Sequence, residues 1–263
     1  MYIAGVVPKS GQAAATLVAE GDKCIVKLEN LNLHGCGVVI RQGASLTAVQ
    51  CTFAENQQDG VVVGLGGKAL LAECTCSGSK EGHGLAVRDA RSYTDAHSCT
   101  FADNKKSGVI VCLGGQADLK DCKCSGSMEG LVVQDAGSFA DAQRCTFVDN
   151  RSIGVSVTSR GEAMLEDCIC SGPLSSFGLY MICGSFAFAL RCDFTDQGVI
   201  VYSGAKAKLV HCSCPHIFCV NNGSKVTTVR CSLDEDHVHK DDGGVVEKRK
   251  FYVDFRKSRA LRK

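Results

Sequence analysis

Four aspartates recur in matching places and could support acid–base or cation chemistry. Asp89 and Asp135 lie in the similar stretches VRDARS and VQDAGS, and Asp95 and Asp141 follow them at the same interval. Paired carboxylates can serve as general acid and base, or can bind a divalent cation. These four residues are the candidate catalytic residues, on condition that the fold brings the members of a pair together.

Cysteine thiols and histidine imidazoles are candidate metal ligands. The stretch HCSCPHIFC at 211–219 combines the ligand types that zinc prefers. However, its Cys212 and Cys214 belong to columns of residues that recur along the whole chain, and this favours a packing role. His237 and His239, in the acidic stretch DEDHVHKDD, are the remaining candidate metal ligands. The sequence predicts no cofactor.

The cysteines reveal the repeat that must position these residues. One cysteine per copy, here called the anchor cysteine, recurs nine times at intervals of 19 to 25 residues: Cys51, Cys74, Cys99, Cys122, Cys145, Cys168, Cys192, Cys212 and Cys231. Copies with Ala three residues before the anchor have Phe two residues after it, and copies with Leu before have Cys after. Large and small side chains thus exchange places, which keeps the volume of stacked layers nearly constant.

Each copy contains short strands and no helical stretch. Mostly polar residues flank the anchor cysteine on both sides, so we expect one strand to run through it with one face buried. A second strand begins at a glycine, as in GVVI at 37, GVVV at 60 and GVIV at 108. Copies of about 23 residues with two or three short strands predict an all-β parallel β-helix of nine to ten coils.

The pattern A-x-L-x-x-C-x-[F/C] followed by G-[VL]-x-V resembles the right-handed parallel β-helix repeat family over about residues 21–242. That family includes pectate lyases, alginate epimerases, the carbohydrate-binding and sugar-hydrolase (CASH) domain, and the β-helix region of an F-box ubiquitin-ligase subunit. The resemblance implies the fold. It does not select a function, because the same solenoid serves enzymes, virion parts and protein-binding scaffolds.

The resemblance to lyases and epimerases implies carboxylates gathered with a base on one exposed sheet. The Asp-Pro-His element of the epimerases, the Arg-x-Pro-x-x-Arg element of pectate lyases, and Trp are all missing from the sequence. Asp89 and Asp135 are two coils apart, about 9.6 Å at ~4.8 Å per coil, and Leu113 takes the equivalent place between them. We therefore expect the candidate aspartates to be structural.

Composition restricts the remaining classes. The net charge is +1, and no apolar run approaches the ~18 residues of a membrane span. The first residues show no basic region followed by an apolar one, as a secretory signal would. Eighteen cysteines without such a signal favour reduced thiols, and hence a cytoplasmic or other reducing intracellular compartment.

The ends of the chain depart from the repeat. We expect residues 1–20 to cap the solenoid, residues 21–242 to form it, residues 234–242 to be an exposed loop, and residues 243–263 to be a basic extension. From residue 247 onward there are eight basic and two acidic residues. Such a segment could contact an acidic partner, and its candidate partner-binding residues are Lys248, Arg249, Lys250, Arg256, Lys257 and Arg259.

The sequence favours a non-enzymatic scaffold that binds protein partners within a larger assembly. One alternative is a polysaccharide-active enzyme or a carbohydrate-binding module, although no sugar-stacking platform supports a carbohydrate ligand. Another is a substrate-receptor domain of a ubiquitin ligase, although no F-box-like helical segment lies in the chain.

Overall fold

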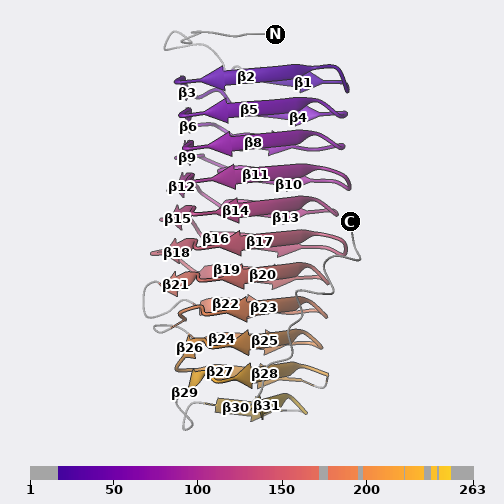
Figure 1. Ribbon diagram of the computed structural model, residues 1–263, viewed down its shortest axis with the longest axis vertical. Helices are drawn as coiled ribbons and strands as arrows, with labels where there is room; N and C mark the ends of the chain where they lie inside the picture. The colour runs from indigo at the N-terminus through magenta and orange to yellow at the C-terminus, as the bar shows by residue number, and fades with distance from the viewer. Residues whose placement is uncertain are drawn as a thin grey trace.

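The computed structural model describes residues 17–171, 177–194, 198–221, 223–233, 238–241 and 243–249. The regular secondary structure of these residues consists of β-strands, and the strands of successive coils pair in parallel. The coils stack into a solenoid whose sides are three sheets (Figure 1). The predicted all-β parallel β-helix is confirmed.

Sheets A and B each contain eleven strands, two more than the nine copies with an anchor cysteine. Sheet A consists of β2 (Ile25–Glu29), β5 (Ser45–Val49), β8 (Lys68–Ala72), β11 (Tyr93–His97), β14 (Gln116–Lys120), β17 (Phe139–Gln143), β20 (Glu162–Glu166), β23 (Phe186–Leu190), β25 (Lys206–Val210), β28 (Lys225–Val229) and β31 (Val245–Arg249). Sheet B consists of β1 (Leu17–Glu20), β4 (Val38–Arg41), β7 (Val61–Val63), β10 (Leu85–Arg88), β13 (Ser107–Cys112), β16 (Glu129–Gln134), β19 (Ile153–Thr158), β22 (Phe177–Met181), β24 (Val199–Tyr202), β27 (Ile217–Val220) and β30 (Val238–Asp241).

The third side is made of shorter strands. Sheet C consists of β3 (Asn32–His34), β6 (Thr52–Ala54), β9 (Thr75–Ser77), β12 (Thr100–Ala102), β15 (Lys123–Ser125), β18 (Thr146–Val148) and β21 (Ile169–Ser171). The pair β26 (Ser213–Cys214) and β29 (Ser232–Leu233) follows it. Single bridges through Asp193 connect the two parts, so this side continues along the solenoid.

The residue before each anchor cysteine is a corner between sheets A and C, and our expectation of one continuous strand there is wrong. The nine residues at this position all have φ between 52° and 56°: Gln50, Glu73, Ser98, Asp121, Arg144, Asp167, Arg191, His211 and Arg230. None is β-branched, the class that the left-handed region disfavours most. The left-handed corner residue is exposed and the anchor cysteine after it points inward, so the corner residue resembles an outward-facing residue of a continuous strand.

The interior contains the alternating layers that the sequence predicts. Phe101 is fully buried and lies in register between Cys76 and Cys124 of the neighbouring coils. Ala96, also fully buried, lies between Leu71 and Leu119. Each large side chain therefore has small neighbours above and below it within its column.

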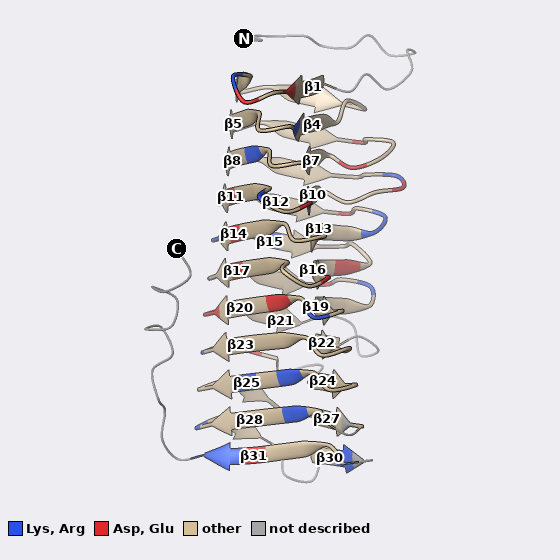
Figure 2. Ribbon diagram, turned by 90° about the vertical axis from the view of Figure 1, so that its right-hand side faces the viewer, with Lys and Arg blue, Asp and Glu red and all other residues tan. Residues whose placement is uncertain are grey.

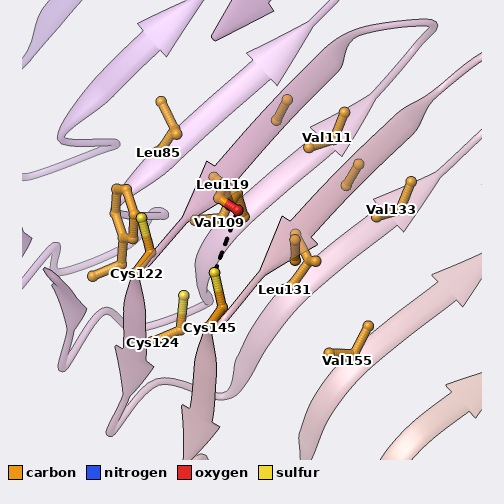
Figure 3. Packing of buried hydrophobic residues seen from close by; sticks show 14 of the residues in the cluster. Leu85, Val109, Val111, Leu119, Cys122, Cys124, Leu131, Val133, Cys145 and Val155 are labelled. Atoms are coloured by element: carbon orange, nitrogen blue, oxygen red, sulfur yellow. Dashed lines mark hydrogen bonds between the residues drawn. The ribbon is translucent and has the colours of Figure 1, made fainter. Parts of the chain in front are cut away.

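The anchor cysteines form a buried column, and all eighteen cysteines of the chain are free thiols. The Cys145 thiol is fully buried and donates to the Leu119 carbonyl oxygen of the preceding coil at 3.5 Å (Figure 3). In the second cysteine column, burial raises the pKa of Cys76, Cys124 and Cys170 well above the usual value. These thiols act as compact apolar side chains.

Strands extend past the predicted limits of the solenoid at both ends. β1 lies within the predicted cap, β30 lies within the predicted loop 234–242, and β31 lies within the predicted basic extension. The cause is continued apolar pairing: Val246 pairs with the inward-facing Val226, so an interior column extends one coil beyond the last anchor cysteine. The rest of the predicted cap and extension, residues 1–16 and 250–263, lies outside the described residues.

Candidate functional site

Asp89 and Asp135 hold corners between sheets B and A. Each has a left-handed backbone, with φ of 70° and 73°. The Asp89 Oδ2 accepts the backbone N–H of Leu65 at 3.1 Å, and the Asp135 Oδ2 accepts that of Leu113 at 3.3 Å. Their carboxylates thus bind the neighbouring coil rather than a shared space, and the structure does not bring the two together.

Asp95 and Asp141 belong to a longer row on the outer face of sheet A. Asp95 pairs in register with Asp118 on β14, and Asp118 pairs with Asp141 on β17. Asp118 was missed from the sequence, although it lies four residues before an anchor cysteine, as do the other two. These three residues, here called the acidic row, are on adjacent strands about 4.8 Å apart.

Neighbouring side chains orient the acidic row. The Tyr93 hydroxyl donates to the Asp118 Oδ2 at 2.9 Å, and the Gln143 amide donates to the Asp141 Oδ2 at 3.4 Å. Asp141 is only 6% exposed. Hydrogen bonds therefore hold two of the three carboxyl groups of the row in place.

The same face continues toward the C-terminal end as an apolar patch of Met164, Phe188, Leu190, Val210 and Val229. These residues form a cluster separate from the core, because the alternate residues of their strands fill the interior. The ammonium group of Lys208 lies 5.8 Å from the centre of the Phe188 ring. A hollow of about 190 Å³ lies where row and patch meet, lined by Asp141, Gln143, Met164, Leu165, Glu166, Phe188 and Leu190.

Ion pairs follow the corner that borders sheet A. Arg144 donates to both carboxylate oxygens of Asp121 at 2.7 and 2.8 Å, which holds the pKa of Asp121 below its usual value. Two coils further along the solenoid, Arg191 donates to Asp167 at 2.6 and 2.7 Å and to Glu166 at 2.7 Å. These pairs connect successive coils along an exposed edge.

The candidate metal ligands do not converge. Cys212 and Cys214 point into the core, whereas His211 is an exposed corner residue. His239 stacks on Phe218 with ring centres 4.8 Å apart, and His237 lies outside the described residues. No group of three or more His, Cys, Asp or Glu side chains in the described part of the chain could hold a metal ion.

Two of the six candidate partner-binding residues lie in a strand. Lys248 and Arg249 are exposed on β31, and Arg249 contacts Glu247 at 2.9 Å. Glu247 also contacts Lys225 at 2.7 Å, and these two cations lower the pKa of its carboxyl group. The other four, at positions 250, 256, 257 and 259, lie outside the described residues.

The structure is that of a β-solenoid repeat protein. Its parallel coils are stacked, its interior is filled, and one long outer face carries an acidic row and an apolar patch. Its sequence matches the family described as the right handed beta helix region over residues 8–143 and 36–213. The chain belongs to this family. Within the described ranges, no helix is both long enough and apolar enough to pass through a membrane.

Several solved structures match the chain at low sequence identity. The Agl-KA catalytic domain is 9% identical with a TM-score of 0.49, over 89% of this chain and 58% of that one, so this chain spans a little over half of its length. A glycosylated TibA fragment is 16% identical with a TM-score of 0.34, over 91% and 94% of the two chains. HetL, a pentapeptide repeat protein of Nostoc, is 13% identical with a TM-score of 0.32, over 90% and 94%. No curated protein matches the sequence.

Proposed function

We propose that this chain is a non-enzymatic interaction scaffold whose partner surface is the outer face of sheet A. One observation carries the proposal: the acidic row continues, strand by strand, into the apolar patch on a single face from β11 to β28. Seven strands at ~4.8 Å spacing cover about 29 Å, and five-residue strands make the face about 16 Å wide.

The chemistry of this face selects its partner. Fixed carboxylates attract Lys and Arg, and the apolar patch stabilises a bound segment by removing its own apolar side chains from water. A face of this width fits an extended segment better than a globular domain, because it is small for a standard protein interface. A basic segment with aromatic or aliphatic residues fits both parts of the face.

The enzymatic alternative has less support. A uronate polymer would meet the acidic row with like charge, and among the described residues there is no metal-ligand cluster that could offset it. The carbohydrate-binding and ubiquitin-ligase alternatives have only the family resemblance behind them. We therefore place the function in the rigid face and in the basic residues of the chain end.

Capture of partners from a native extract tests the proposal. The test variant is Asp118→Asn with Asp141→Asn, and the matched control is Asp103→Asn with Asp149→Asn, which removes two exposed charges from the corner after sheet C. We expect the test variant to lose its partners and the control to keep them. Equal recovery would refute the surface, and loss of turnover of an acidic polysaccharide in the test variant alone would establish the enzyme instead.

A further inference from the structure

The apolar patch is buried more deeply than an outer sheet face should be. Leu190, Val210 and Val229 occupy the position directly before the corner and are 8%, 1% and 1% exposed. At the equivalent position of β5, Val49 is only partly buried. Val210 lies in register between Leu190 and Val229, whereas Val49 lies between Glu29 and Ala72, so the C-terminal half of this face is its apolar part.

The chain supplies a segment of matching composition. Residues 250–263 read KFYVDFRKSRALRK, with six basic residues and one acidic residue. Its first part carries Phe251, Tyr252, Val253 and Phe255, and its second part carries most of the positive charge. Along the segment, apolar residues come first and basic residues follow. Along the face, starting from β31, the apolar patch comes first and the acidic row follows.

Distances along the face agree with this order. The patch lies one to four strands from β31, about 5 to 19 Å away, and the acidic row lies five to seven strands away, about 24 to 34 Å. An extended chain that leaves Arg249 at ~3.3 Å per residue reaches about 7 Å at Phe251 and 20 Å at Phe255. It reaches about 23 Å at Arg256 and 33 Å at Arg259.

The charge on the face changes sign along the solenoid. Figure 2 shows acidic colour on β20 and basic colour on β25 and β28. The acidic residues of β20 are Glu162 and Glu166, beside the acidic row, and the basic residue next to the patch is Lys208.

We propose that residues 250–263 bind back across the outer face of sheet A, with the apolar part on the apolar patch and the basic part on the acidic row. The occupant is this segment of the same chain. If the face is also the partner surface, the segment competes with the partner and regulates its access. That consequence rests on the proposed function, whereas the docking itself does not.

A peptide-binding experiment tests the docking without any partner. A chain that ends at Arg249 keeps β31, and a labelled peptide of residues 250–263 is titrated into it. We expect saturable binding that weakens as salt screens the charges. Full-length protein, whose face is already occupied, should bind the same peptide at least tenfold more weakly.

Variants assign the binding to the two parts of the face. Asp118→Asn with Asp141→Asn should weaken peptide binding by at least about 2- to 30-fold, because this is the range for two fully exposed ion pairs, whereas Asp118 is partly buried and Asp141 is 6% exposed. The control Asp103→Asn with Asp149→Asn should leave it unchanged. A peptide with the basic half placed before the apolar half should bind more weakly than the native order. Failure of the peptide to bind, or equal binding by the full-length chain, would overturn the proposal.

A measurement on the full-length chain covers the case in which the shortened chain does not fold. The protein contains no Trp, so Phe255→Trp introduces a single fluorophore. We expect a blue-shifted emission that is shielded from a soluble quencher, at a protein concentration where sedimentation shows a monomer. A solvent-exposed indole in the folded monomer would overturn the proposal, and shielding only in a dimer would assign the face to a second copy. If docking fails while the acidic-row variant still loses its partners, the proposed function stands without it.

Discussion

Phe101 and Cys124 lie side by side in register on β12 and β15, and neither side chain is exposed. The same pairing of a large with a small residue recurs between Cys76 and Phe101 on the preceding coil. Because each phenyl ring fills the space that the neighbouring cysteines leave, the alternation of Phe and Cys maintains the packing density of the interior.

Loss of one ring should leave a cavity that the stacked coils cannot close. Phe101→Ala should destabilise the protein by about 3–5 kcal/mol, and Ala96→Leu should cost about 1–3 kcal/mol through overpacking. The double variant Ala96→Leu with Phe101→Cys should recover only part of the loss, because the new leucine would lie between Leu71 and Leu119. Unchanged urea midpoints in the single variants would contradict the alternating layers.

Thiol reactivity should follow burial. Cys183 is exposed, Cys24 and Cys231 are partly buried, and the other fifteen cysteines, among them Cys122 and Cys145, are buried. A small alkylating reagent should therefore label one thiol quickly under native conditions, and Cys183→Ser should remove this fast phase. Rapid labelling of most of the 18 thiols would show that the columns do not face inward.

Two buried asparagines should differ in their contribution to stability. The Asn104 amide donates to the Cys76 carbonyl oxygen at 3.2 Å and accepts the Ser79 N–H at 3.1 Å. Asn56 is equally buried, but its amide makes no hydrogen bond within the described chain. Asn104→Ala leaves two backbone groups unpaired, at about 1–3 kcal/mol each. Asn56→Ala should cost clearly less, and equal losses in chemical denaturation would contradict this difference.

Acid should destabilise the protein partly through His83. Burial lowers the pKa of this imidazole to about 4, and its Nδ1 accepts the Ser107 N–H at 3.2 Å, a bond that only the unprotonated Nδ1 can make. The unfolded chain binds this proton near pH 6.5, so the contribution is complete above pH 6.5 and is lost as the pH falls toward 4. His83→Gln keeps an acceptor that does not titrate, so its unfolding free energy should change less between pH 6.5 and 4. An identical pH dependence in both proteins would refute this role.

The sequence predicted the columns of the core because each of them repeats in every copy. It did not reveal the corners, since an exposed left-handed residue such as Asp121, followed by the inward-facing Cys122, looks like an outward-facing residue of a continuous strand. The ends were misjudged for a similar reason: Val246 extends an apolar column without the cysteine that marked the other coils.

The candidate site was only partly accessible from the sequence. Asp118 was visible in the repeat alignment, four residues before its anchor cysteine, and completes the row that Asp95 and Asp141 begin. The apolar patch was not, because Leu190, Val210 and Val229 resemble any outward-facing strand residues until their burial is known. A row or patch formed by strands about twenty residues apart depends on register, which the fold alone determines.

Site-specific photo-crosslinking tests the central claim, that the outer face of sheet A is the interaction surface. A photoreactive residue is placed at Asp118 on β14, or at Lys123 on β15, which lies in the same coil but on sheet C. In the chain that ends at Arg249, incubated with native extract, we predict a crosslinked protein partner from position 118 and little from position 123. Equal yields from the two positions, or a partner crosslinked only from position 123, would contradict the account.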